Sequence, residues 1–93
     1  MIIDIEEIMS GKDTGKFFGD SLLYNIKRGN RTEINITTGV HVNDSFWKGF
    51  FEESMYHYKD SDVINNHVTI IGTDFQKKNV KDNLRILTAI VNA

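Results

Sequence analysis

The chain has 93 residues, of which 40% are hydrophobic and 26% charged, a globular balance that argues against disorder across most of its length. This length gives room for one core, so we expect a single domain over residues 1–93 and no large enzyme cleft. The formal net charge of -2 gives no overall attraction to nucleic acid or anionic lipid, and the absence of cysteine excludes disulfides and thiolate chemistry.

The sequence contains no pattern typical of a membrane segment or a secretion signal. No segment approaches the roughly 20 apolar residues of a membrane span. Residues 1–9 are acidic where a signal peptide needs a basic start and a long apolar run. We therefore expect a cytoplasmic protein that does not bind a membrane.

The first part of the chain predicts a strand, a helix and a second strand. Isoleucines alternate with acidic residues over 3–8, which is typical of a half-buried strand, and a glycine-containing loop follows at 10–15. Apolar residues then recur every four positions over 18–26, which predicts a helix that ends at Gly29-Asn30. The period returns to two over 32–37, in a segment rich in β-branched residues.

The second part predicts a helix, a strand and a last helix. Asp44 and Ser45 are good N-cap residues, and aromatic and apolar residues follow them at helical spacing until 60–62 ends the helix. A third strand is expected within 63–71. A cap at 72–74 then begins a last helix whose apolar stripe consists of Val80, Leu84, Leu87 and Val91.

The predicted order is strand, helix, strand, helix, strand, helix. Alternation of this kind favours parallel strands joined by right-handed crossovers, with helices on at least one face of the sheet. We therefore predict the α/β class, with a small, mostly parallel sheet of three to four strands and about three helices. A homodimer stays open, because the two edges of so small a sheet can be protected by self-association.

Motifs for catalysis and for metal binding are not found. Residues 11–16 resemble a phosphate-binding loop, but three residues separate the two glycines where that motif needs four, and phenylalanine follows the lysine. His41, His57 and His67 fall in three different predicted elements, without a second ligand at a diagnostic interval. We therefore expect no enzyme, no metal site and no cofactor.

A basic stripe marks the last predicted helix. Lys77, Lys81 and Arg85 recur at i, i+4 and i+8, and Lys78 joins them away from the apolar side. The stripe is most simply the solvated face of an amphipathic helix. Contact with phosphate or nucleic acid is the alternative, which we do not favour because no aromatic residue or groove-reading motif accompanies the charges.

The middle helix carries a long run of aromatic residues. Phe46, Phe50 and Phe51 lie at helical spacing and are most simply core residues. Trp47 and Tyr56 are harder to place inside so small a chain. The alternative that stays open for them is an exposed surface that contacts a partner.

The helix start at residues 42–47 resembles that of the STAS-like domain family, relatives of the anti-sigma factor antagonists. The stretch reads Val-Asn-Asp-Ser-Phe-Trp, and Asp44 takes the position of the first family serine while Ser45 takes that of the second. The loop at 10–15 is similar to the family's small, basic, acidic, variable, glycine turn, with Lys12 in place of the usual arginine. The resemblance covers the whole chain in order and implies a STAS-like fold.

This resemblance implies a regulatory role for Ser45. In the antagonists, the second serine is phosphorylated by a partner kinase that is also the anti-sigma factor, and the modification switches partner choice. A phosphate at a helix start meets free backbone donors and the positive end of the dipole, although Asp44 would oppose its charge. The expected partner-binding or regulatory residues are Asp44, Ser45, Trp47 and Lys12. A plain N-cap role for Asp44 or Ser45 is the simpler alternative.

Three functions stay open on the sequence alone. The first is a non-catalytic protein-binding module, a STAS-like switch or adaptor that docks a kinase-type anti-sigma factor or another regulatory protein through the helix starting at Ser45. The second is a small phage or mobile-element inhibitor that binds a host enzyme or complex. The third is nucleic-acid binding through the basic stripe of Lys77, Lys78, Lys81 and Arg85.

Overall fold

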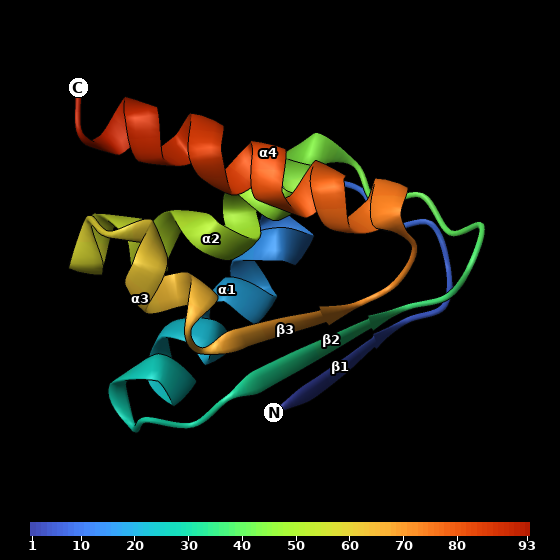
Figure 1. Cartoon of the computed structure of the whole chain (residues 1–93), viewed down its shortest axis with the longest axis horizontal. Helices are drawn as coiled ribbons and strands as arrows, with labels where there is room; N and C mark the ends of the chain where they lie inside the picture. Colours follow the sequence, from blue (N-terminus) through green and yellow to red (C-terminus); the bar gives the residue numbers. More distant parts are fainter.

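Three short strands form one parallel sheet in the order β1-β2-β3, and the helices lie on one side of it (Figure 1). The computed structural model describes residues 1–93, the whole chain. Its elements are β1 (Ile2–Ile5), α1 (Lys12–Lys27), β2 (Thr32–Ile36), α2 (Asp44–Tyr58), α3 (Ser61–Asn65), β3 (Val68–Ile71) and α4 (Asp74–Val91). The predicted α/β class and parallel sheet are confirmed, and α3 is a helix that the sequence patterns did not predict.

The strands turn one face to the core and the other to solvent. Ile3, Ile34 and Ile70 form a row across the three strands on the helix side. The opposite face is polar at its centre, where the Asn35 side-chain amide donates a hydrogen bond of 2.8 Å to the Asp4 carboxylate. Parallel sheets are usually covered on both faces, and the polar residues at the centre of this face are compatible with its being uncovered.

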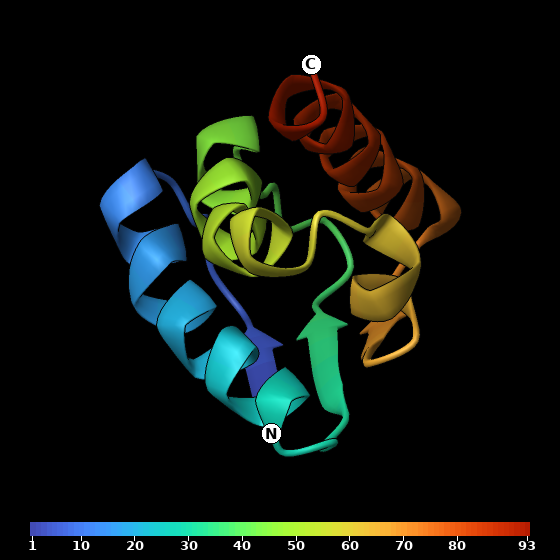
Figure 2. The same ribbon diagram turned by 90° about the vertical axis from the view of Figure 1, so that its left-hand side faces the viewer.

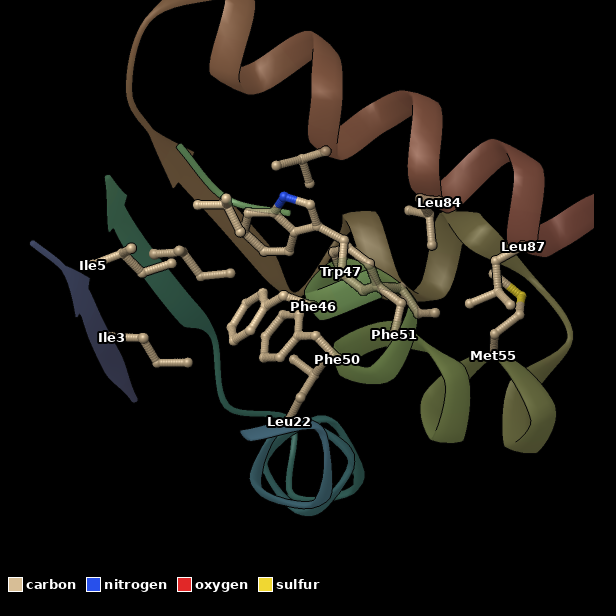
Figure 3. Packing of buried hydrophobic residues seen from close by; sticks show 14 of the residues in the cluster. Ile3, Ile5, Leu22, Phe46, Trp47, Phe50, Phe51, Met55, Leu84 and Leu87 are labelled. Atoms are coloured by element: carbon tan, nitrogen blue, oxygen red, sulfur yellow. The ribbon is translucent and has the colours of Figure 1, made fainter. Parts of the chain in front are cut away.

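Helix α2 supplies the centre of the core and lies between α1 and α4 (Figure 2). Four of its aromatic side chains each expose 1% of their surface or less and pack together between the sheet and the other helices (Figure 3). These residues are Phe46, Trp47, Phe50 and Phe51. The Trp47 ring stacks on that of Phe51 with 5.9 Å between centroids.

Trp47 is therefore a core residue, and the interpretation of its side chain as an exposed partner contact is wrong. The reason is that α2 packs against both α1 and α4 and turns its aromatic side chains toward the sheet, so it has more than one buried face. Of the two aromatic residues that were hard to place, only Tyr56 lies at the surface, with 55% of its area exposed.

Glycines let α1 and α2 approach until their backbones touch. A Cβ atom added at Gly15 would collide with the Phe46 carbonyl, and one added at Gly19 would lie 2.8 Å from the Phe50 oxygen. From the α2 side, a Cβ atom added at Gly49 would collide with the Lys12 carbonyl of α1. The close crossing fixes the first turn of α2, and with it the position of the candidate site, against α1.

Two element boundaries differ from the sequence prediction. Helix α1 begins at Lys12, directly after Gly11 with its φ of 95°, so only the start of the predicted loop at 10–15 is a loop. At the other boundary, Lys59 ends α2 in the left-handed conformation and Asp60 then caps α3. The Asp60 carboxylate accepts a hydrogen bond of 2.9 Å from the Asp62 N–H, and β3 follows at Val68–Ile71, within the segment 63–71 that the sequence predicted to contain it.

The start of α4 is as the sequence predicted. Thr73 accepts a hydrogen bond of 3.1 Å from the Gln76 N–H, and the Gln76 side chain accepts one of 2.8 Å from the Thr73 N–H. This reciprocal capping box satisfies two backbone donors that the first turn would otherwise leave free. None of the helices combines the length and hydrophobicity needed to cross a membrane.

Candidate functional site

The first turn of α2 is capped by Asn43, the residue before the two that the sequence suggested. Asn43 has an extended backbone, and its side-chain oxygen accepts hydrogen bonds of 3.0 Å from both the backbone N–H and the hydroxyl of Ser45. Asp44 and Ser45 are the first residues of the helix itself. The N-cap role proposed for either of them is therefore wrong, and the Ser45 hydroxyl is not needed to cap the helix.

Asp44 ties the start of α2 to α4. Its carboxylate accepts a hydrogen bond of 3.0 Å from the Asn83 side-chain amide. The same amide donates a hydrogen bond of 2.9 Å to the backbone carbonyl of Asn79, one turn earlier on α4. The side-chain amide of Asn79 in turn donates a hydrogen bond of 3.3 Å to the Val42 carbonyl. These contacts hold the loop before α2 and its first turn against the side of α4.

A groove of about 260 Å³ runs between the start of α2 and the second half of α4. We call it the Ser45 groove. On the α2 side it is lined by Asp44, Ser45 and Lys48, and on the α4 side by Ile86, Leu87 and Ile90. Ile86 and Ile90 expose 56% and 52% of their area, so the groove has an apolar wall that faces solvent.

The Ser45 groove offers a hydroxyl, one cation and an apolar wall within one small surface. Ser45 is half-buried, and Lys48 lies one turn further along the same helix. A phosphoryl group on Ser45 would lie near the positive end of the α2 dipole and within the reach of Lys48, while the Asp44 carboxylate opposes it. The apolar wall of the groove is suited to contact with an apolar side chain. Phosphorylation of Ser45 would add negative charge to the groove.

Lys12, the other residue that the family resemblance implicates, does not lie in the Ser45 groove. Its ammonium group pairs with the Glu52 carboxylate at 3.3 Å. Glu52 follows Ser45 by seven residues, about 10 Å along the axis of α2. The structure therefore places Lys12 beside the middle of α2, between α1 and α2, and apart from the helix start.

The basic stripe of α4 divides into two pairs with different surroundings. Lys78 and Arg85 both contact Asp82, at 3.1 Å and 3.5 Å. Lys77 and Lys81 form no ion pair and line a second cleft on another face of α4. Two of the four cations thus share one carboxylate within the helix, which offsets one of the four positive charges that would attract nucleic acid.

One acidic group between α1 and α2 titrates abnormally. A hydrogen bond with the Asp20 carboxyl group, followed by partial loss of hydration and by the charge of Asp20, raises the pKa of Glu53. Lys16 and Lys27 lower it by a smaller amount. Glu53 is exposed and lies outside the Ser45 groove, and no group of three or more histidine or acidic side chains comes together to hold a metal ion.

Comparison of the chain with protein-family models, with curated proteins and with solved structures finds no match. The function must therefore be inferred from the site itself. Sequence reasoning located the helix start but missed Ile86 and Ile90, although these two residues repeat at i, i+4 outside the apolar stripe of α4. Two large apolar residues outside the buried stripe of a helix indicate an exposed apolar surface, and this pattern could have identified them.

Proposed function

We propose that the protein is a non-catalytic, STAS-like protein-binding module that docks a regulatory protein over the Ser45 groove. The observation that carries this proposal is the position of the half-buried Ser45 hydroxyl, in the first turn of α2 and opposite two exposed isoleucines. Apolar anchors beside polar groups are the usual composition of a contact surface between proteins. The resemblance of residues 42–47 to the STAS-like family supports the same surface.

Phosphorylation of Ser45 is the switch in this proposal. The hydroxyl donates to the Asn43 side chain, and a phosphate ester has no proton to donate there. The Asn43 cap on the Ser45 backbone N–H can persist, so the helix start stays folded while its surface gains about two negative charges. That charge next to Asp44 disfavours an acidic partner surface and favours a basic one. A kinase-type anti-sigma factor, or another regulatory protein, is the expected partner.

The docking surface can be tested by comparing the proteins that the full chain retains from a cell lysate with those that its variants retain. Ile90→Lys places a charge on the apolar wall of the groove, where the exposed side chain makes a loss of folding unexpected. Phe17→Lys is the matched control, because Phe17 is 71% exposed on α1. We expect a protein that binds the wild type and Phe17→Lys but not Ile90→Lys. Equal retention by all three chains would overturn the proposal.

The switch needs a separate experiment. Ser45→Ala removes the hydroxyl and leaves the Asn43 cap on the backbone, whereas Ser45→Glu adds a charge at the same position. We expect Ser45→Ala to retain the wild-type partner and Ser45→Glu to lose it. If both variants retain it equally, Ser45 is not a switch. The identity of the retained protein also distinguishes a regulatory adaptor from an inhibitor of a host enzyme.

A further inference from the structure

The outer edge of β3 is a free strand edge with its backbone groups unpaired. Thr32 on β2 donates its N–H to the His67 carbonyl at 2.7 Å and pairs with Val68 in the strand register. Neighbouring residues of a strand turn their backbone groups to opposite sides, so those of Val68 and Ile70 point away from β2. No backbone hydrogen bond from another part of the chain reaches them.

A cleft of about 370 Å³ lies directly along this edge, and we call it the β3 groove. Its floor is apolar and comes from three elements: Phe51 of α2, Val68 and Ile70 of β3, and Val80 and Leu84 of α4. Helix α4 runs back over the sheet in the direction opposite to β3 (Figure 1). The end of α3 closes the cleft near the start of the strand, at Asn65.

The rim of the β3 groove is basic. Lys77 and Lys81 line it from α4, and neither has an acidic partner within the chain. They are one helical turn apart, a rise of about 6 Å. Residues i and i+2 of an extended chain are separated by a similar distance of about 6.7 Å. Side chains on one face of a strand laid along β3 can therefore match the two ammonium groups.

We propose that the β3 groove binds an extended, acidic segment of a partner protein, which joins the sheet as a fourth strand. The backbone of the segment pairs with Val68 and Ile70. Every second side chain of the segment points to the helix side. Some of these side chains are apolar and fill the floor, and at least one is a carboxylate that pairs with Lys77 or Lys81. Free backbone groups, an apolar floor and unpaired cations together select this occupant, since strand addition takes affinity from the backbone and specificity from alternate side chains. This site does not depend on the Ser45 groove.

A second copy of this chain does not fit the β3 groove. Two β3 edges related by a twofold axis would bring Lys77 and Lys81 of both copies together, and like charges repel across such an interface. Strand β1 is the other free edge, but its core-facing residues Ile3 and Ile5 are 6% and 1% exposed under their own helices. They are not free to fill the groove of another molecule.

The test uses the full chain to select from a displayed library of random peptides of about nine residues, which is within the usual range of strand lengths. We expect the selected sequences to alternate apolar with polar residues and to carry Asp or Glu. A selected peptide is then synthesised with a fluorescent label and titrated with the wild type and with Lys77→Glu/Lys81→Glu. We expect the charge reversal to weaken binding at least about tenfold.

Lys78→Glu/Arg85→Glu is the matched control, because it reverses two charges of the same helix that already pair with Asp82. We expect it to change binding less than about twofold. Hydrogen exchange provides the second readout: the bound peptide should protect the amides of Val68 and Ile70. Failure to select any peptide, selection of basic or uncharged sequences, equal loss in both double variants, or unprotected amides at β3 would each overturn the proposal.

Discussion

The two grooves beside α4 differ in the part of the chain that a partner can contact. The Ser45 groove offers side chains, with Ile86 and Ile90 as an exposed apolar wall and Ser45 as a modifiable hydroxyl. The β3 groove offers the backbone of a strand edge above an apolar floor, with Lys77 and Lys81 as the rim. One phosphate can change the charge of a surface made of side chains and so change which partner binds. A strand edge instead binds any ligand segment whose extended backbone can pair with it.

One helix can serve both grooves because they use different faces of it. Lys77, Lys81 and Leu84 turn toward β3, while Ile86 and Ile90 turn toward the start of α2. Substitutions that affect one groove and leave the other intact are therefore available, and they can separate the contributions of the two grooves.

The largest effect is expected at Phe51, which is 1% exposed and belongs to the floor of the β3 groove. Phe51→Ala should lower the free energy of unfolding by about 3–5 kcal/mol, because it removes a buried ring and leaves a cavity. Denaturant unfolding measures this loss. If a change below about 1 kcal/mol were observed, the ring would not be packed as described.

A smaller loss is expected from Gly15→Ala, which acts on the Ser45 side. The new Cβ atom meets the Phe46 carbonyl, so α1 and α2 have to separate at the first turn of α2. We expect the free energy of unfolding to fall by about 1–3 kcal/mol, although alanine favours a helix more than glycine does. Thr14→Ala is the control, because Thr14 is an exposed residue of the same turn. Equal stability of the two variants would contradict the close crossing.

Asn43→Ala should cost about 1 kcal/mol of stability, because the Ser45 N–H loses its cap. The same change frees the Ser45 hydroxyl from its acceptor. Selected peptides should bind the β3 groove of this variant as they bind the wild type, provided the measurement is made where both proteins are folded. Weakened peptide binding would show that the two grooves are coupled through α2.

The smallest effect is expected from Glu53→Gln, which tests the surface outside both grooves. The pKa of Glu53 is raised in the folded chain, so its contribution to stability is present below the unfolded pKa and is lost as pH rises through the folded pKa. At neutral pH the ionised group is repelled by Asp20. Glu53→Gln should then be slightly more stable than the wild type, by less than about 0.5 kcal/mol because the site is exposed to solvent.

The stability difference between Glu53→Gln and the wild type should shrink as the pH falls from neutral to about 4, near the ordinary pKa of a glutamate. Urea unfolding at several pH values measures this change. A difference that grows on acidification would contradict a raised pKa of Glu53 in the folded chain. Both grooves should bind their ligands as before, since neither is lined by Glu53.

The sequence predicted several features through local rules that the structure confirms. The succession of the strands and the three long helices along the chain follows from hydrophobic period, and the Thr73 cap of α4 follows from its residue types. The short helix α3 was missed because five residues with Ile64 as their one buried side chain give no measurable period. The cap of α2 was misplaced by one residue because asparagine, aspartate and serine are nearly equivalent N-caps.

What the sequence by itself determined is the succession of strands and long helices, the parallel sheet that this alternation favours, and the position of Ser45 in the first turn of a helix. These depend on contacts within a turn or on the period of apolar residues, which neighbours in the chain fix. Only the tertiary structure decided that Trp47 is buried, that Lys12 pairs with Glu52 and that Lys77 and Lys81 border a free strand edge. Those outcomes depend on which faces of α2 and α4 meet other elements, and no local pattern records this.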